Sequence, residues 1–377
     1  MNDDALKLTT YFGERDRASG RFLADAFTDV YARHELQTSV LMRGIEGFGP
    51  SQHLRTDRLL SLSEDLPLVS VAVDTRERIE AALQELSGFR FDGLVTLERA
   101  RLLTGALDEP PALPWAGEAA TKLTVYVGRQ ERAGDRPAYE AVVAFLHEHG
   151  VAGASVLLGV DGTAHGVRQR ARFFGRNASV PLMVIAVGES ATIVSLLPKL
   201  ARLLPRPLVT LERVTVCKRD GRRFVAPHAL PGSDPTGLGI WQKLMVYTSE
   251  QARHAGQPVH QLLIRELRRA GAAGATSLRG IWGYHGDHVP HGDTFWQLRR
   301  RVPVITVVVD APERIRRWFE VVDGITDEAG LVTSEMVPAF RATAKEHQRG
   351  GLRLAAAISS LRPHRGADFR AEGPPRP

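Results

Sequence analysis

Three stretches of the chain open with nearly the same five residues: KLTTY at residues 7–11, KLTVY at residues 122–126 and KLMVY at residues 243–247. Two of them close on Leu-Glu-Arg, at residues 97–99 and 211–213, and the third closes more loosely on Ser-Glu-Met at residues 334–336. From the opening lysine to the closing glutamate the separations are 91, 90 and 92 residues. Matching ends at nearly equal spacing identify three tandem copies of one structural unit.

Within each unit the hydrophobic periodicity changes in the same order. An alternating segment at the opening lysine predicts a strand. An apolar stripe then predicts a helix, formed in the first unit by Phe22, Leu23, Ala26, Phe27, Val30 and Tyr31. A second strand is expected at residues 38–45, 154–160 and 276–281, and a third at residues 67–73, 181–187 and 303–309. A long Gly-containing loop separates these two strands, and a second helix and a closing strand complete the unit.

This order, βαββαβ, is that of a ferredoxin-like split unit. Right-handed crossovers place both helices on one face of a four-stranded sheet, which leaves the other face bare. A bare apolar face needs a covering partner, and two further copies in the same chain supply one. The sequence therefore predicts an α+β protein whose three ferredoxin-like units pack as an intramolecular pseudo-trimer. Three independent units on a string are the alternative.

The expected domains are residues 1–104, 119–218 and 240–340, separated by Pro- and Gly-containing linkers. Beyond Pro338 we expect a helix to about Ser360, and residues 341–377 as a whole are expected to form a basic, largely disordered tail. This tail holds eight Lys or Arg and three acidic residues, which accounts for five of the six net positive charges of the chain.

The composition excludes several classes of protein. The opening MNDD is not the start of a signal peptide, and no apolar stretch approaches the roughly 20 residues that a membrane span needs. The single cysteine, Cys217, excludes a disulfide framework and a multi-cysteine zinc site. A cytoplasmic location is therefore expected. Because the excess of positive charge lies mostly in the tail, a nucleic acid partner is not expected.

The loop that follows the second strand carries a resemblance to a known family. The stretch LMRGIEGFG at residues 41–49, followed by SLSEDLP at residues 61–67 and the third strand, resembles the domain-of-unknown-function 190 family of the PII-like (GlnB-like) superfamily. The third unit is similar, with RGIWGY at residues 279–284 and VPVI at residues 302–305. The middle unit departs from the pattern: its LGVDG at residues 158–162 lacks the arginine, and it has Gly188 where the others have Asp74 and Asp310.

The resemblance, which covers about three quarters of the chain, implies a sensor and not an enzyme. PII-like proteins are trimers of ferredoxin-like units that bind small effectors, often adenine nucleotides, in the clefts between units. A long loop between the second and third strands reports to a protein target such as a transporter or an enzyme. Here one chain would supply all three units and act as a monomeric pseudo-trimer. Because the three loops differ in sequence, we expect the three clefts to differ.

The candidate effector site is the base of this loop. Glycines there allow close approach of the backbone to a ligand, successive backbone N–H groups can bind an anion, and an arginine adds a bidentate contact. The candidate residues are Arg43, Gly44, Glu46, Gly47 and Gly49 in the first unit and Arg279, Gly280 and Gly283 in the third. The alternative at these positions is that the glycines only shape the loop.

The third loop offers a different chemistry. Residues 284–293, YHGDHVPHGD, hold His285, Asp287, His288 and His291, and imidazole and carboxylate groups are competent ligands for zinc, copper or nickel. No helix or strand spacing fixes their geometry, so a solvated His-rich loop is the alternative interpretation. A metal-binding protein that uses this loop is thus a second functional hypothesis.

The closing glutamates Glu98, Glu212 and Glu335 are expected to form structural ion pairs with arginines of the same or the next unit, and a binding role is the alternative. The sequence shows no motif of a catalytic site, which favours a non-enzymatic protein. A third hypothesis is a non-catalytic scaffold that acts through the basic tail.

Overall fold

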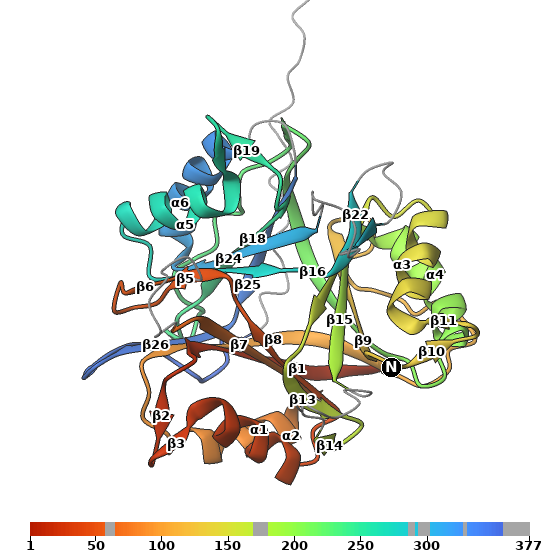
Figure 1. The fold of residues 1–377 in the computed structure, drawn as a ribbon, viewed down its shortest axis with the longest axis horizontal. Helices are drawn as coiled ribbons and strands as arrows, with labels where there is room; N and C mark the ends of the chain where they lie inside the picture. Colours follow the sequence, from red (N-terminus) through yellow and green to blue (C-terminus); the bar gives the residue numbers. More distant parts are fainter. Residues whose placement is uncertain (57–64, 169–179, 286–290, 293–301, 327–329, 357–377) are drawn as a thin grey trace, which may run out of the picture.

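The computed structural model describes residues 1–56, 65–168, 180–285, 291–292, 302–326 and 330–356. Three lobes of the chain surround a common centre, and in each lobe the helices lie outside and the strands inside (Figure 1). Among the residues described, six helices accompany one large antiparallel sheet. None of these helices is long and apolar enough to cross a membrane.

Each lobe is one of the three repeats, and its elements follow the predicted order. The first unit consists of β1 (Asn2–Gly13), α1 (Leu23–Arg33), β4 (Thr38–Arg43), β7 (Pro67–Thr75), α2 (Arg76–Leu86) and β8 (Gly93–Thr104). The second consists of β9 (Ala120–Gly128), α3 (Ala138–Glu148), β12 (Gly153–Leu158), β15 (Pro181–Glu189), α4 (Ser190–Leu203) and β16 (Leu208–Arg219). The third consists of β18 (Trp241–Ser249), α5 (Val259–Arg269), β21 (Ala275–Arg279), β24 (Pro303–Asp310), α6 (Pro312–Ile325) and β25 (Leu331–Val337).

Within the first unit, β1 is central and pairs antiparallel with β7 and β8, while β4 pairs with β7 on its other side. The other two units repeat this order. The helices bury their predicted stripes against one face of the strands, and each unit has its own cluster of buried residues there. The prediction that Phe22 belongs to the buried stripe of the first helix is wrong, because Phe22 precedes α1 and is 43% exposed.

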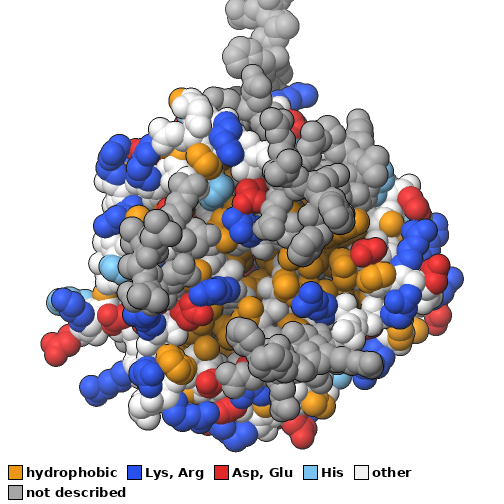
Figure 2. Space-filling model, viewed as in Figure 1, with side chains coloured by type: hydrophobic (Ala, Val, Ile, Leu, Met, Phe, Trp, Pro, Cys, Tyr) orange, Lys and Arg blue, Asp and Glu red, His pale blue; other side chains and the backbone are white. Residues whose placement is uncertain are grey.

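The opposite faces of the three sheets cover one another. A fourth cluster of buried residues draws on all three units, for example Met42 of the first, Tyr126 of the second and Ile305 of the third. On the surface, hydrophobic side chains gather near the middle of the molecule while charged ones lie around its periphery (Figure 2). The apolar face that each unit alone would leave bare is therefore buried by its neighbours.

Strand pairing also joins the units, in two sets that each run once around the molecule. In the first set the end of a closing strand pairs with the closing strand of the next unit: β8 with β16, and β16 with β25. The circle closes through β26 (Ala339–Ala344), which pairs with β8. Because each unit contributes a strand to its neighbour, the three cannot separate without breaking backbone hydrogen bonds.

The second set uses short strands at the base of the loops and runs in the opposite sense. The first unit's β5 (Glu46–Phe48) pairs with β21 of the third, and the third unit's β22 (Trp282–His285) pairs with β12 of the second. The second unit's β13 (Asp161–Ala164) pairs with β4 of the first. Return strands complete short hairpins at β6 (Leu54–Thr56), β14 (Val167–Arg168) and β23 (His291–Gly292).

The remaining short strands form local hairpins at equivalent places. They are β2 (Arg17–Ala18) with β3 (Arg21–Phe22), β10 (Arg132–Ala133) with β11 (Arg136–Pro137), β19 (Arg253–His254) with β20 (Gln257–Pro258), and β17 (Arg222–Arg223) with the end of β16.

The prediction of a helix after Pro338 is wrong, and so is the prediction that disorder begins at residue 341. β26 and β27 (His347–Gly351) form a hairpin whose turn holds Lys345 at a φ of 53°. The third unit has no fourth unit to receive its extension, so this extension pairs with the available edge of β8 in the first unit. Residues 357–377, the rest of the expected tail, lie outside the described residues.

Candidate functional site

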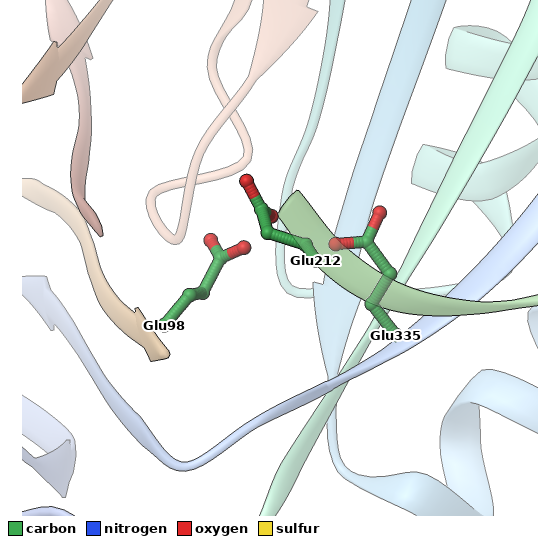
Figure 3. A group of neighbouring side chains, drawn as sticks. All are labelled: Glu98, Glu212 and Glu335. Carbon is green, nitrogen blue, oxygen red and sulfur yellow. The ribbon is translucent and has the colours of Figure 1, made fainter. Parts of the chain in front are cut away.

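The opening lysines and closing glutamates meet at the centre of the molecule. In each unit the register places them directly opposite each other on neighbouring strands: Lys7 opposite Glu98, Lys122 opposite Glu212, and Lys243 opposite Glu335. Side chains on a strand alternate between its two faces, so equal spacing in the three repeats sends all six to the same inner face. Figure 3 shows the three glutamate side chains gathered around one point.

These six side chains form a closed ring of alternating charge. Within a unit, the Nζ atom lies 3.3 Å from the glutamate oxygen at Lys7–Glu98, 2.8 Å at Lys122–Glu212 and 3.1 Å at Lys243–Glu335. Between units, the distance is 2.5 Å for both Lys7–Glu212 and Lys122–Glu335, and Lys243 also pairs with Glu98. All six are between 2% and 6% exposed. The expectation that the glutamates pair with arginines is therefore wrong, since their partners are lysines.

Burial and charge oppose each other in this ring. Burial alone would raise the pKa of Glu98 and Glu212, but the neighbouring lysine ammonium groups lower both, that of Glu212 to about 2. Burial would likewise lower the pKa of Lys7 and Lys243, and their glutamate partners raise it instead. At Lys122 burial prevails and lowers the pKa. With two carboxylates within 2.8 Å, we regard Lys122 as protonated at neutral pH.

The ring predicts a loss of stability in acid. A carboxyl whose pKa is lower in the folded than in the unfolded state contributes stability above its unfolded pKa, about 4.3, and that contribution is lost as the pH falls toward its folded pKa. The free energy of unfolding should therefore fall steadily from about pH 4.5 toward pH 2, as measured by urea denaturation at a series of pH values. A Glu77→Gln variant, which alters an exposed carboxylate outside the ring, should retain this profile. Constant stability between pH 5 and pH 3 would contradict the prediction.

Carboxylate oxygens of Glu98, Glu212 and Glu335 lie within 4.8 Å of one another, a spacing that could hold a metal ion. The three lysines already balance these three carboxylates, so a divalent cation would add uncompensated charge in a buried place. The geometry favours a structural ring over a metal site.

A cleft of about 230 Å³ lies between the second and third units. The third unit lines it with Tyr247, Tyr284, His285 and Leu331, and the second with Ile185, Val187 and Arg219, among others. His285 pairs with Asp220, which follows the end of β16, so the loop base of the third unit is tied to the second unit here. Arg219 is partly buried and has no side-chain partner among the residues that the structure describes.

The corresponding cleft between the first and third units is much smaller, about 40 Å³. Its lining includes Tyr11, Leu94 and Val307, which match Tyr247, Leu331 and Ile185 in the repeat. It also includes Arg55, whose Nε atom lies 2.9 Å from Asp65. The cation of this cleft is therefore already neutralised.

Between the first and second units lies an open depression of about 340 Å³. Its lining includes His165, Arg202, Arg206 and Pro207, and both arginines are exposed. Burial, together with the nearby Arg206, lowers the pKa of His165. Tyr126, the counterpart of Tyr11 and Tyr247, is buried away from this depression. The three spaces between units are thus unequal in volume and in charge.

The predicted arginines lie at the loop bases and are held by glutamates of their own units. Arg43 donates two hydrogen bonds to Glu14, at 2.8 and 3.1 Å, and Arg279 lies 2.6 Å from Glu250. Neither lines the clefts described above. A role in effector binding stays a prediction for both.

The predicted glycines lie where strands of two units approach closely. Gly44 and Gly280 donate their N–H groups to the carbonyl oxygens of Pro67 and Pro303 in their own units at 2.7 Å, and Glu46 and Gly47 belong to β5. An added Cβ would lie 2.8 Å from a backbone oxygen of the neighbouring unit at Gly47 and at Gly280, and 2.3 Å from one at Gly283. Gly47, Gly280 and Gly283 therefore allow the close approach of strands at the joints between units. In addition, Gly49 lines the first–third cleft and Gly283 lines the second–third cleft.

Of the predicted metal ligands, His285 lines the second–third cleft and pairs with Asp220. Asp287 and His288 lie outside the described residues, and for His291 only the backbone is described, opposite Gly283. Metal binding by this loop stays a prediction.

Sequence reasoning missed Arg219, Tyr247 and Tyr284 as cleft residues. Tyr247 carries the clearest signal, because it ends the repeated opening motif. Arg219 falls in the predicted linker between residues 218 and 240. Only the pairing of β16 with β25 places it beside the third unit.

Comparison with known proteins agrees with the three-unit organisation. The family model DUF190, described as Uncharacterized ACR, COG1993, matches residues 5–102, 120–216 and 241–339. A UPF0166 protein from Aquifex aeolicus (strain VF5) is 33% identical over 94 residues, 25% of this chain and 88% of its own length. UPF0166 protein MJ1524 from Methanocaldococcus jannaschii is 32% identical over 89 residues, 24% of this chain and 82% of its own.

Among solved structures, aspartate kinase from Synechocystis aligns over 91% of this chain and 45% of its own, with 9% identity and a TM-score of 0.24, which carries no argument about the fold. The family match, in contrast, recurs in three tandem copies that together span more than three quarters of the sequence. This chain therefore belongs to the DUF190 family, described as Uncharacterized ACR, COG1993.

Proposed function

We propose that this chain is a PII-like regulatory protein in which three ferredoxin-like units form an intramolecular pseudo-trimer. A small anionic effector, with an adenine nucleotide as one candidate, binds in a cleft between units. The loops between the second and third strands of the units report the bound state to a protein target. The proposal assigns binding to the chain and no catalysis.

The main support for this proposal is the geometry of the second–third cleft. It is lined by two units at once, and β22, which forms part of its wall, leads directly into the third loop. A ligand that contacts Tyr284 and His285 therefore contacts the base of the loop and the neighbouring unit together. Binding that favours one arrangement of this joint changes the population of loop conformations, which is the requirement for a reporter.

The relatives support an origin of the chain from a one-unit protein. Each matches about one unit of this chain over 82–88% of its own length. Fusion of three such units in one chain allows each cleft to change independently, because the three copies are no longer encoded by one sequence. The unequal clefts fit this history.

Ligand-induced thermal shifts test the proposal. The intact protein is heated with AMP, ADP, ATP, cyclic nucleotides, inorganic phosphate, zinc or copper. A ligand present at 100 times its Kd adds about 2.7 kcal/mol of stability, so an effector should raise the Tm clearly. A shift with metals alone would favour the His-rich loop, and a variant lacking His285, His288 and His291 would then lose it. No shift with any compound would contradict effector binding.

Arg43 and Arg279 remain candidates for contact with the effector. Each would have to leave its glutamate, Glu14 or Glu250, to bind an anion. Release of this kind would couple effector binding to the position of the loop base.

A further inference from the structure

The first–third and second–third clefts occupy corresponding places in the repeat but differ in charge. We infer that the chain binds a single amphipathic anion, in the second–third cleft, with its apolar body against Tyr247 and Leu331 and its one anionic group on Arg219. This inference rests on the proposed function, and it names the cleft, the number of sites and the chemistry of the ligand.

The position of Arg219 is set by strand register. It lies opposite Leu331, the first residue of β25. In the other two joints the residue opposite the equivalent leucine is uncharged: Thr104 faces Leu208, and Ala342 faces Leu94. The guanidinium group of Arg219 is thus a feature of one joint and not of the repeat.

Arg219 is also available to a ligand. No described residue supplies it with a side-chain partner, and no acidic residue is among the described residues that line this cleft. Asp220, its neighbour in sequence, pairs instead with His285. A guanidinium that has no partner among the described residues and lies beside apolar walls gains most from a carboxylate or a phosphate, which it can bind through two parallel hydrogen bonds.

The first–third cleft does not suit an anion. Its volume is about 40 Å³, and its cation, Arg55, is 2.9 Å from Asp65 and 3.8 Å from Asp16. Asp92 also lines the cleft, so an incoming anion would meet an acidic group and a guanidinium that is already paired.

The first–second depression does not suit an amphipathic ligand. Its arginines, Arg202 and Arg206, are exposed, so water screens their charge. The tyrosine of the repeat, Tyr126, is not part of its lining. An apolar body would find little cover there.

The size and charge of the second–third cleft restrict its ligand. Its volume of about 230 Å³ lies below the roughly 300–1,000 Å³ of sites for drug-sized ligands. One guanidinium balances one anionic group, and a triphosphate would bring further negative charges among apolar walls. The ligand class is therefore a small aromatic or aliphatic compound that carries one carboxylate or one monophosphate.

Phenyl phosphate is a suitable probe, because it combines a planar apolar body with one phosphate. Its binding to the intact chain is followed by ligand-observed NMR, with phenol and inorganic phosphate as compounds that each lack one half. We expect one equivalent of phenyl phosphate per chain and weaker binding of both halves. Arg219→Ala should weaken binding at least tenfold, Arg219→Lys should weaken it less, and Arg213→Ala, an exposed change on the same strand, should leave it unchanged.

Unfolding midpoints of the variants confirm that each is folded. The inference is overturned if phenyl phosphate shows no saturable binding, if Arg219→Ala binds as the wild type does, or if two or three equivalents bind. An effector found by thermal shift that ignores Arg219 would overturn the inference and leave the proposed function standing. Binding of phenyl phosphate at Arg219 without any shift from the effector panel would leave the inference standing and would exclude the tested nucleotides as the effector.

Discussion

Replacing Lys122 by methionine is expected to lower the free energy of unfolding by about 3–5 kcal/mol, because it removes one of the two lysines that pair with each of two buried carboxylates, Glu212 and Glu335. Lys122 lies 2.8 Å from Glu212 and 2.5 Å from Glu335, and it is the least exposed member of the ring. Methionine has a similar length and no charge, so the loss reflects charge and not volume. Urea denaturation at pH 7 measures the change.

Two further variants show that charge balance is the cause. Lys122→Met combined with Glu212→Met removes one charge of each sign, and Glu335 keeps Lys243 at 3.1 Å. The double variant should therefore recover at least half of the loss. Arg33→Met, which breaks an exposed pair with Glu85, should cost less than about 1 kcal/mol. A cost of that size for Lys122→Met as well would refute the ring as a stabilising element.

Substitution of Gly162 by alanine is expected to cost about 2–4 kcal/mol, because the added methyl group would break the joint between the first and second units. A Cβ at this position would lie 2.0 Å from the backbone oxygen of Ser39 and 2.7 Å from Pro181. The Ser39 oxygen belongs to β4 and cannot move away without separating β4 from β13. The Thr163 amide and hydroxyl, which both bond the Ser39 hydroxyl, would be displaced as well.

Gly324→Ala is the matched control, since no atom lies within 4 Å of a Cβ built there. This glycine is near the end of α6, where alanine is the better helix former, so its variant should be as stable as the wild type or slightly more stable. Both variants are compared by thermal and urea unfolding. Equal stability of Gly162→Ala and the wild type would mean that the pairing of β13 with β4 does not stabilise the protein.

Whether an element can be predicted from the sequence depends on how far apart in the sequence its contacting residues are. The helix α1 is predicted well, because Leu23, Ala26, Phe27, Val30 and Tyr31 form one stripe and all are buried. The prediction of a helix after Pro338 is wrong, because β26 pairs with the free edge of β8, more than 200 residues away in sequence. Local periodicity contains no information about which edges remain free after the units have packed.

The same limit applies to the site. Arg43 and Arg279 stand out in sequence because they belong to a repeated motif, whereas Arg219 belongs to no motif and occurs at one joint only. Its importance arises from β16 continuing past its own unit and pairing with β25. A residue that acts through a neighbouring unit is recognised only when the neighbour is in place.

The sequence by itself determined the three units and their order of strands and helices. These features follow from periodicity and equal spacing, which act within each repeat. Only the tertiary structure decided that each lysine also meets a glutamate of another unit, that the glycines serve the joints, and that the three spaces between units are unequal. Those outcomes depend on how the sheets pack against one another, because side chains 213 residues apart, as in the pair Lys122–Glu335, are brought together only by that packing.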